Sequence, residues 1–324
     1  MMHTLRTADL LTLLVLLATP HAALAQSRPA AADTIRLRFN WPVGKTATVE
    51  TTRFRERVTE TTDTFAGGAR YRMQVRQHPE GLLIVHDSFD FAGPTALASQ
   101  LALHVAAERV ADLVPSYVVS REGEFLRIDS VEALRARMSS LFSSMLQQGD
   151  STGQASGVLA SLTSESVLNS IAAQEWNALV GMWIEADLEL GEKYELEEEA
   201  PIPFIPGAMV TMQSEFSIAR RVPCRESGST PDCIEIRLMS RPNGEEVQML
   251  IRRFMDRIAA MPGATSFGFE SLDLENELVL IIEPATLLPH RARLSKRVKG
   301  VVVAQGKKSD VSQLDVRTYA YTYR

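Results

Sequence analysis

The sequence predicts an α+β protein: a curled antiparallel β-sheet, forming a half-barrel or open barrel, with about four covering helices. Three observations favour this class. Stretches with apolar residues at every second position outnumber those with helical spacing, and most of them follow one another across short turns. In proteins with a parallel sheet, strands and helices alternate one for one, and the expected elements of this chain do not. A long antiparallel sheet is expected to curl.

The first 25 residues are expected to be a cleaved signal peptide. Arg6 supplies a positive charge, residues 10–18 form a short apolar core, and Ala23 and Ala25 are the small residues that signal peptidase requires. We expect cleavage after Ala25 and a periplasmic or secreted protein. The apolar core is about half the roughly 20 residues that a membrane-spanning helix needs, and no later stretch reaches that length, so no transmembrane segment is expected.

Composition indicates a single β-rich domain over residues 26–324. Hydrophobic residues make up 45% of the chain and charged residues 23%, which is ordinary for a globular protein and too apolar for general disorder. The net charge of −6 gives no general attraction for phosphate backbones, so nucleic acid is not an expected partner.

The N-terminal part of this domain is predicted to be extended. The expected strands are residues 35–41, 46–64, 71–76 and an apolar run that begins at residue 82. Within 46–64 the apolar residues change from odd to even positions, which a bulge near Thr51 would explain. A turn at 79–81 predicts a hairpin, and Gly123 predicts a second, tight hairpin over 117–128.

Helical spacing is found in four places. The expected helices are residues 97–113, 131–147, 164–183 and 245–260. Pro115 follows the first of them. Asp129 with Glu132, and Asn243 with Glu246, are typical of capping boxes at the starts of the second and the last. The last three helices are the expected helical insertions in the β-rich domain.

The C-terminal part again predicts mainly strands. The extended segments are residues 185–189, 195–199, 216–222, 233–239, 272–282, 290–298, 301–305 and 311–323. The prolines of Pro201 to Pro206 cannot lie in a central strand and indicate a sheet edge or a covering loop.

The only two cysteines, Cys224 and Cys233, are expected to form a disulfide. They flank residues 225–232, which contain turn-forming glycine and proline, and thiols of this kind pair in an oxidising compartment. No C-x-x-C spacing and no further ligand nearby in the sequence favours a redox or metal site.

No pattern indicates catalysis, a metal site or a cofactor. Gly44, Lys45 and Thr46 resemble the end of a phosphate-binding loop, but its first glycine is missing and the following segment is extended. The sequence has no G-x-S-x-G motif and no clustered histidines. Acidic groups at 185–189, 195–199 and 273–277 leave a carboxylate-dependent hydrolase as the least favoured alternative.

Aromatic and methionine side chains are the candidates for binding an apolar ligand. They are Met138, Phe142, Met145, Trp176, Trp183, Tyr319 and Tyr321. Flexible methionines and aromatic rings suit a groove for a hydrophobic ligand, but they more often belong to an ordinary packed core.

Several local motifs carry a resemblance that spans nearly all of residues 26–324. They are LRFNWPVG at 37–44, SREGEFLRI at 120–128, Trp176 with Gly181 and Trp183, the cysteine hairpin, and EPATLLP at 283–289. Together they resemble a group of secreted bacterial proteins of unknown function. More distantly, the expected architecture is similar to that of periplasmic lipoprotein carriers of the LolA and LppX type, which hold acyl chains in the concavity of a curled sheet. That likeness transfers no residue.

We therefore expect an exported, non-catalytic envelope protein. Its half-barrel, covered by the helices at 131–147 and 164–183, would bind a hydrophobic or lipid-like ligand. The alternative is a scaffold or protein-interaction module of the envelope that uses the surface at Pro201 to Pro206 and the sheet edges. The sequence leaves the ligand, the protein partner and the oligomeric state open.

Overall fold

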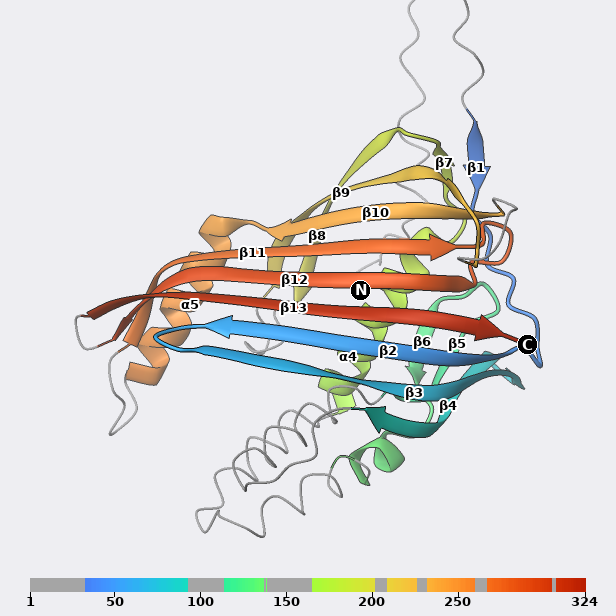
Figure 1. Ribbon diagram of the computed structural model, residues 1–324, viewed down its shortest axis with the longest axis horizontal. Coiled ribbons are helices and arrows are strands. Elements are labelled where there is room, and N and C mark those ends of the chain that lie inside the picture. Colours follow the sequence, from blue (N-terminus) through green and yellow to red (C-terminus); the bar gives the residue numbers. More distant parts are fainter. Residues whose placement is uncertain are drawn as a thin grey trace, which may run out of the picture. The chain divides into compact units, whose positions relative to one another are not determined.

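One large antiparallel sheet organises the chain (Figure 1). The computed structural model describes residues 33–92, 114–136, 138, 165–201, 209–225, 232–259, 267–304 and 307–324. Over these residues the sheet has 11 strands, and Asp33–Arg324 belong to a single compact unit. In spatial order the strands are β6 (Phe125–Ile128), β5 (Tyr117–Val119), β4 (Gly81–Ala92), β3 (Thr62–His78), β2 (Thr46–Val58), β13 (Lys307–Tyr323), β12 (Pro289–Ala304), β11 (Phe267–Ile282), β10 (Cys233–Pro242), β9 (Met209–Val222) and β8 (Lys193–Pro201).

The sheet is an open meander. Every pair of neighbouring strands is consecutive in the sequence except β2 and β13, which join the two ends of the described chain over the register Ala47↔Tyr323 to Val58↔Ser312. The edge strands β6 and β8 do not pair with each other. The predicted antiparallel sheet is confirmed, and the protein is mostly β. The two segments expected at 290–298 and 301–305 are one continuous strand, β12.

A second, two-stranded sheet pairs β1 (Thr34–Arg36) with β7 (Asp187–Glu189). β1 is shorter than the strand expected at 35–41. The amides of Leu37, Arg38 and Asn40 bond to carbonyls of loops instead of a neighbouring strand. Leu37 and Trp41 are nonetheless buried, which explains the alternating apolar pattern.

The bulge expected near Thr51 is wrong. β2 pairs with both β3 and β13 without any shift of register. The odd positions of β2 stay on one face throughout, but they change from the buried Ala47 and Val49 to Thr51 and Arg53. Phe54 lies on the opposite face and is exposed. The apolar pattern shifts because one face becomes polar, and the strand itself does not slip.

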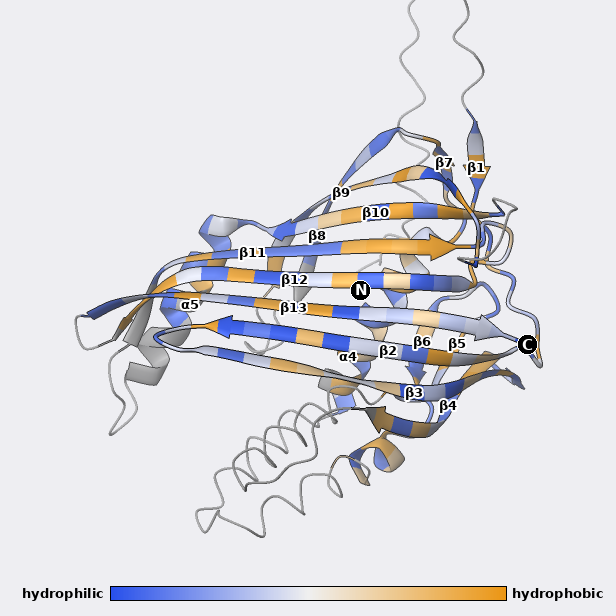
Figure 2. Ribbon diagram, in the orientation of Figure 1, coloured by the Kyte–Doolittle hydropathy of each residue, from blue (hydrophilic) through white to orange (hydrophobic). Residues whose placement is uncertain are grey.

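The sheet has two different faces. Residues directly opposite in the register share a face. On the face that we call the core face, Val49, Tyr71 and Tyr319 are buried. The outer face carries cross-strand ion pairs, such as Arg72 with Asp87 at 2.8 Å, which are typical of a solvated sheet surface. Figure 2 shows the apolar residues concentrated in the right-hand part of β11, whereas β2 is largely hydrophilic toward its arrowhead at the left.

Two helices lie behind the sheet in the view of Figure 1. α4 (Glu165–Leu179) continues into the 3-10 helix η2 (Gly181–Trp183), and α5 (Gly244–Ala259) lies at the left-hand end of the strands. They coincide with the helices expected at 164–183 and 245–260. Among the described residues, no helix has the length and apolar character needed to cross a membrane.

The cap of α5 is only partly as expected. The side-chain oxygen of Asn243 accepts hydrogen bonds from the amides of Glu245 and Glu246, at 3.1 and 3.2 Å. The Glu246 carboxylate, however, does not return to Asn243. It accepts bonds from the amide and the hydroxyl of Thr211 in β9, which ties the helix to the sheet.

Four predictions lie wholly or partly outside the described residues. They are the signal peptide at 1–25 with cleavage after Ala25, the helix at 97–113, most of the helix at 131–147, and the surface at Pro201 to Pro206 except for Pro201. Residues 131–136 are helical, as expected for the start of that last helix.

The predicted disulfide between Cys224 and Cys233 is present and closes the hairpin of β9 and β10. Replacing both cysteines with serine is expected to lower the free energy of unfolding by about 2.5 kcal/mol, because the unfolded chain regains the entropy of a small loop. Urea denaturation of the double variant and of the unreduced parent measures the difference. A double variant as stable as its parent would contradict a structural role for this bond.

Candidate ligand-binding surface

The half of the core face under α4 is filled by side chains. Trp176 of α4 is 2% exposed, and its ring lies 5.2 Å from that of Trp41 and 5.4 Å from that of Tyr117. Its indole nitrogen donates a hydrogen bond to the Gly123 carbonyl at 2.8 Å. The cavity left beside it has a volume of about 20 Å³, enough for about one water molecule. A lipid-like ligand has no room there.

The polar groups around this small cavity include three tyrosines, His86 and Glu175 of α4. Burial raises the pKa of Tyr71, Tyr117 and Tyr321 well above the ordinary value of a tyrosine. Burial also lowers the pKa of His86 to about 4, so its imidazole is neutral at pH 7. Its Nδ1 donates a hydrogen bond to the Pro115 carbonyl at 2.9 Å. These tyrosines and His86 are buried polar side chains that line the cavity.

The structure separates the residues predicted to bind a ligand. Trp176, Trp183 and Tyr319 are buried in the packed core, and Tyr321 is half-buried beside the small cavity. Met138 is half-buried against a satellite cluster: Ile128, Val131, Leu134, Leu168 and Ala172. Phe142 and Met145 lie outside the described residues. The contacts of the described members are those of core side chains.

A row of polar residues crosses the core face next to the packed half. Each member lies directly opposite the next on the neighbouring strand. From β9 to β2 the row is Ser214, Ser240, Asn276, Lys296, Asp315 and Arg55. We call this set the polar row. It marks the line at which the apolar core ends.

One ion pair includes a member of the polar row, and a separate chain of hydrogen bonds beside the row reaches α4. The Arg53 guanidinium donates to both carboxylate oxygens of Asp315, at 2.6 and 3.2 Å. Arg317 donates to the hydroxyl of Tyr319, which in turn donates to Glu175 of α4 at 3.1 Å. The side chains of Arg53 and Asp315 are only 11% and 19% exposed, so this ion pair compensates two largely buried charges.

Sequence reasoning missed the polar row, although one signal was visible. The change of the odd positions of β2 from apolar to polar marks where the row begins. Its other members come from strands far apart in the sequence, and only the register of the sheet aligns them.

Beyond the polar row, the core face carries aliphatic side chains again. Leu272, Leu274 and Val298 lie half-buried on it. A groove of about 580 Å³ lies between Gln248 of α5 and the ends of the long strands. Gln248 and the core-face residues Leu272, Gly300 and Val311 line it. The remaining lining residues lie at outer-face positions of the register: Val58, Ser271, Asp273, Lys299, Val301, Asp310 and Ser312. Pockets that bind small molecules have volumes of roughly 300–1,000 Å³, so the groove is large enough for one.

No protein-family model matches this chain, and no curated protein matches it either. A function is therefore argued from the geometry of the groove and of the filled half.

A second group of residues comes together at the disulfide. The side chain of His290 at the start of β12 lies beside Cys224 and Cys233, and the three potential ligand atoms are within 4.8 Å of one another. Sequence reasoning did not place His290 near the cysteines, because it lies on a different hairpin. Cys224, Cys233 and His290 do not line the groove, so they form a separate candidate site.

Proposed function

We propose that this protein is an exported, non-catalytic binding protein of the cell envelope that holds a hydrophobic or lipid-like ligand in the groove beside α5. The observation that carries the proposal is the contrast in free volume between the part of the sheet under α4 and the strand ends beside α5. The groove has a volume of about 580 Å³, whereas the cavity under α4 has about 20 Å³. The disulfide supports export, since such bonds persist in oxidising compartments.

The proposal includes a curl of the sheet into a half-barrel whose concave side is the core face. Two findings support it: the sheet is open and antiparallel, and α4 and α5 lie on the same side of it. The likeness to carriers of the LolA and LppX type is part of the same proposal. The expectation from sequence placed the ligand beneath the helices at 131–147 and 164–183. The present proposal places it beneath α5.

The lining of the groove favours an amphiphile over a plain hydrocarbon. Leu272 and Val311 supply aliphatic surface. Gln248 of α5 supplies a polar side chain at the same site, whereas the register places the side chains of Asp273 and Lys299 on the outer face. Apolar surface with a few polar groups that orient the ligand is typical of small-molecule sites. A ligand with a single acyl chain and a polar head would contact both the aliphatic and the polar residues of the groove.

A matched pair of variants tests this placement. Leu272→Gln removes aliphatic surface from the groove, and Leu314→Gln changes another half-buried leucine in a long strand that does not line the groove. The first variant is expected to weaken binding of a fluorescent fatty acid about tenfold or more, since burying a leucine contributes roughly 1.5–3 kcal/mol. The second is expected to bind as the parent does. Equal losses in both variants, or a parent that does not bind the probe, would contradict the proposal.

The second candidate is a scaffold that recruits an envelope protein by its sheet edge. β8 is an edge strand of nine residues, and an exposed edge can accept a further strand from a partner. Its acidic side chains, Glu195 and Glu197 to Glu199, reduce unspecific pairing of that edge. If the Leu272→Gln variant retains the same envelope partner as its parent in a pull-down while no lipid is found, this candidate is favoured.

A further inference from the structure

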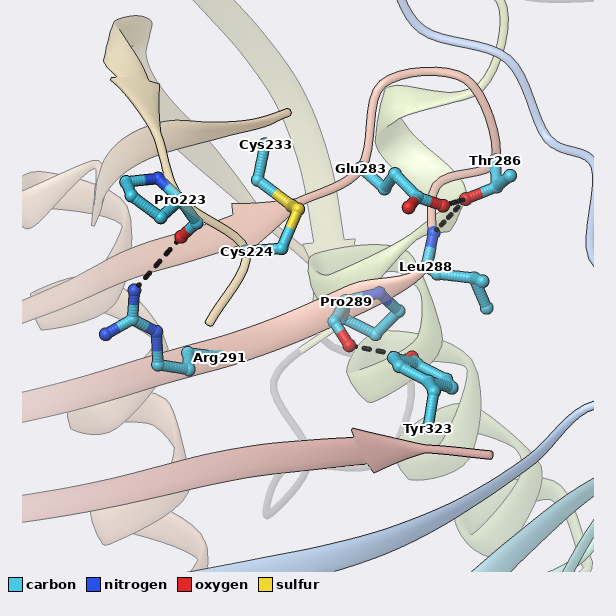
Figure 3. Close-up of a disulfide and its surroundings, with 9 residues drawn as sticks. All are labelled: Pro223, Cys224, Cys233, Glu283, Thr286, Leu288, Pro289, Arg291 and Tyr323. Atoms are coloured by element: carbon cyan, nitrogen blue, oxygen red, sulfur yellow. Dashed lines mark hydrogen bonds between the residues drawn. A yellow bond between two sulfur atoms is a disulfide. The ribbon is translucent and has the colours of Figure 1, made fainter. Parts of the chain in front are cut away.

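The disulfide hairpin and the start of β12 bring two sulfurs and an imidazole together. Figure 3 shows the disulfide beside Pro289 and Arg291, the residues that flank His290. One potential ligand atom from each of Cys224, Cys233 and His290 lies within 4.8 Å of the other two. Cys233 is fully buried at the start of β10, so this group lies at the edge of the core.

The position of His290 is fixed by its neighbours. Its ring packs edge-on against Tyr323 at 5.2 Å, and the Tyr323 hydroxyl donates a hydrogen bond to the Pro289 carbonyl at 2.7 Å. The Nε2 atom of His290 is shut off from solvent and has no hydrogen-bond partner among the described residues. A buried ring nitrogen without a partner is unusual in proteins, and a bound metal ion is one explanation for it.

We propose that Cys224, Cys233 and His290 form a zinc site when the disulfide is reduced, with water as the fourth ligand. Two thiolates and an imidazole are a donor set that zinc prefers, and three protein ligands leave one position open. In the oxidised protein the sulfurs are bonded to each other and no thiolate is present to bind the metal. The same three residues thus hold a covalent bond in one redox state and a metal ion in the other.

The change of state is a two-electron reduction by an external dithiol. The two thiols of the reductant become a disulfide, and their two electrons and two protons convert the Cys224–Cys233 bond into two thiols. Zinc then displaces one proton from each thiol and binds the two sulfurs and the neutral imidazole. In the reverse direction an external disulfide takes up two electrons by thiol–disulfide exchange and is reduced to two thiols, while the Cys224–Cys233 bond forms again and the ion is released.

The test measures zinc retained by the whole protein. The protein is reduced with a dithiol, desalted under nitrogen, mixed with zinc, desalted again and analysed for metal. We expect one zinc ion per reduced chain and none on the oxidised chain. His290→Gln should weaken zinc binding at least tenfold, a loss that even the removal of an outer-shell partner can cause. His78→Gln, at the turn between β3 and β4, is the matched histidine control and should bind zinc as the parent does.

A spectroscopic readout separates this site from adventitious binding. Cobalt added to the reduced protein should produce a thiolate-to-metal charge-transfer absorption, which is lost in the variant with both cysteines replaced by serine. Bound zinc should also slow the alkylation of both thiols in the parent but not in His290→Gln. Circular dichroism of each reduced sample establishes that it is folded. A folded reduced protein without the cobalt band, or with equal zinc affinity in His290→Gln, overturns the proposal.

Discussion

Replacing Trp176 with alanine is expected to lower the free energy of unfolding by about 3–5 kcal/mol, the usual cost of removing a large aromatic side chain from a core. Trp176 fills the space between α4 and the sheet, where it contacts Trp41 and Tyr117, and it satisfies the Gly123 carbonyl. The cavity beside Trp176 is small, which shows that the surrounding side chains are closely packed. Few of them can therefore move into the space that the indole ring would leave. Urea denaturation followed by circular dichroism measures the loss.

Ile171→Ala is the matched control for this experiment. Ile171 lies on the same helix but is 48% exposed, so its truncation should change the stability by less than about 0.5 kcal/mol. If Trp176→Ala cost as little as this control, the half of the core face under α4 would not be tightly packed. The ligand could then lie where the sequence first suggested, beneath α4.

Acidification should destabilise the protein through His86. Burial lowers the pKa of His86 from 6.5 to about 4 in the folded state. Between these values the unfolded chain binds a proton that the folded chain does not, so stability is complete above pH 6.5 and falls as the pH approaches 4. At 1.36 kcal/mol for each pKa unit, the contribution lost from this one group is about 3 kcal/mol. Denaturant midpoints measured across this range give the slope.

Two variants identify the titrating group. His86→Gln should remove the part of the slope that lies between pH 6.5 and about 4, although the variant itself will be less stable. Tyr117→Phe alters the ring that packs at 5.3 Å against His86 but leaves the imidazole in place, so it should keep the slope. A slope that survives in His86→Gln would show that carboxylates alone cause the acid sensitivity.

Most elements of the fold could be predicted because their signals are local. The alternation of leucines with acidic residues around 272–282 reflects a strand with one buried face, and β11 has that structure. The turn at 79–81 and the caps of α5 are likewise properties of a few adjacent residues. The cysteine pairing was predictable because the loop between them is short and no other thiol competes.

Long-range pairing could not be predicted in the same way. Nothing local in β2 or β13 shows that the two strands are neighbours, since their partnership depends on closing a loop of most of the chain. For the same reason a polar change within β2 was interpreted as a bulge. The residues that would have corrected this, Arg317 and Asp315, come from the far end of the sequence.

The candidate sites could not be predicted either, because they also depend on residues that are far apart in the sequence. Trp176 and Tyr319 were candidates for binding a ligand, and the structure buries both in the core. Aromatic side chains in a core and in a ligand groove have the same sequence pattern. The groove beside α5 is formed by strand ends from both halves of the chain. His290 reaches the disulfide only because β10, β11 and β12 are neighbours in the sheet.

Native mass spectrometry tests the central claim most directly. The protein is purified without detergent from the envelope of its own cells, and its mass is compared with that of the bare chain. The account predicts one adduct of lipid-like mass per chain, kept by Leu314→Gln and depleted in Leu272→Gln. A bare mass in every preparation, with no lipid recovered by solvent extraction, would contradict it.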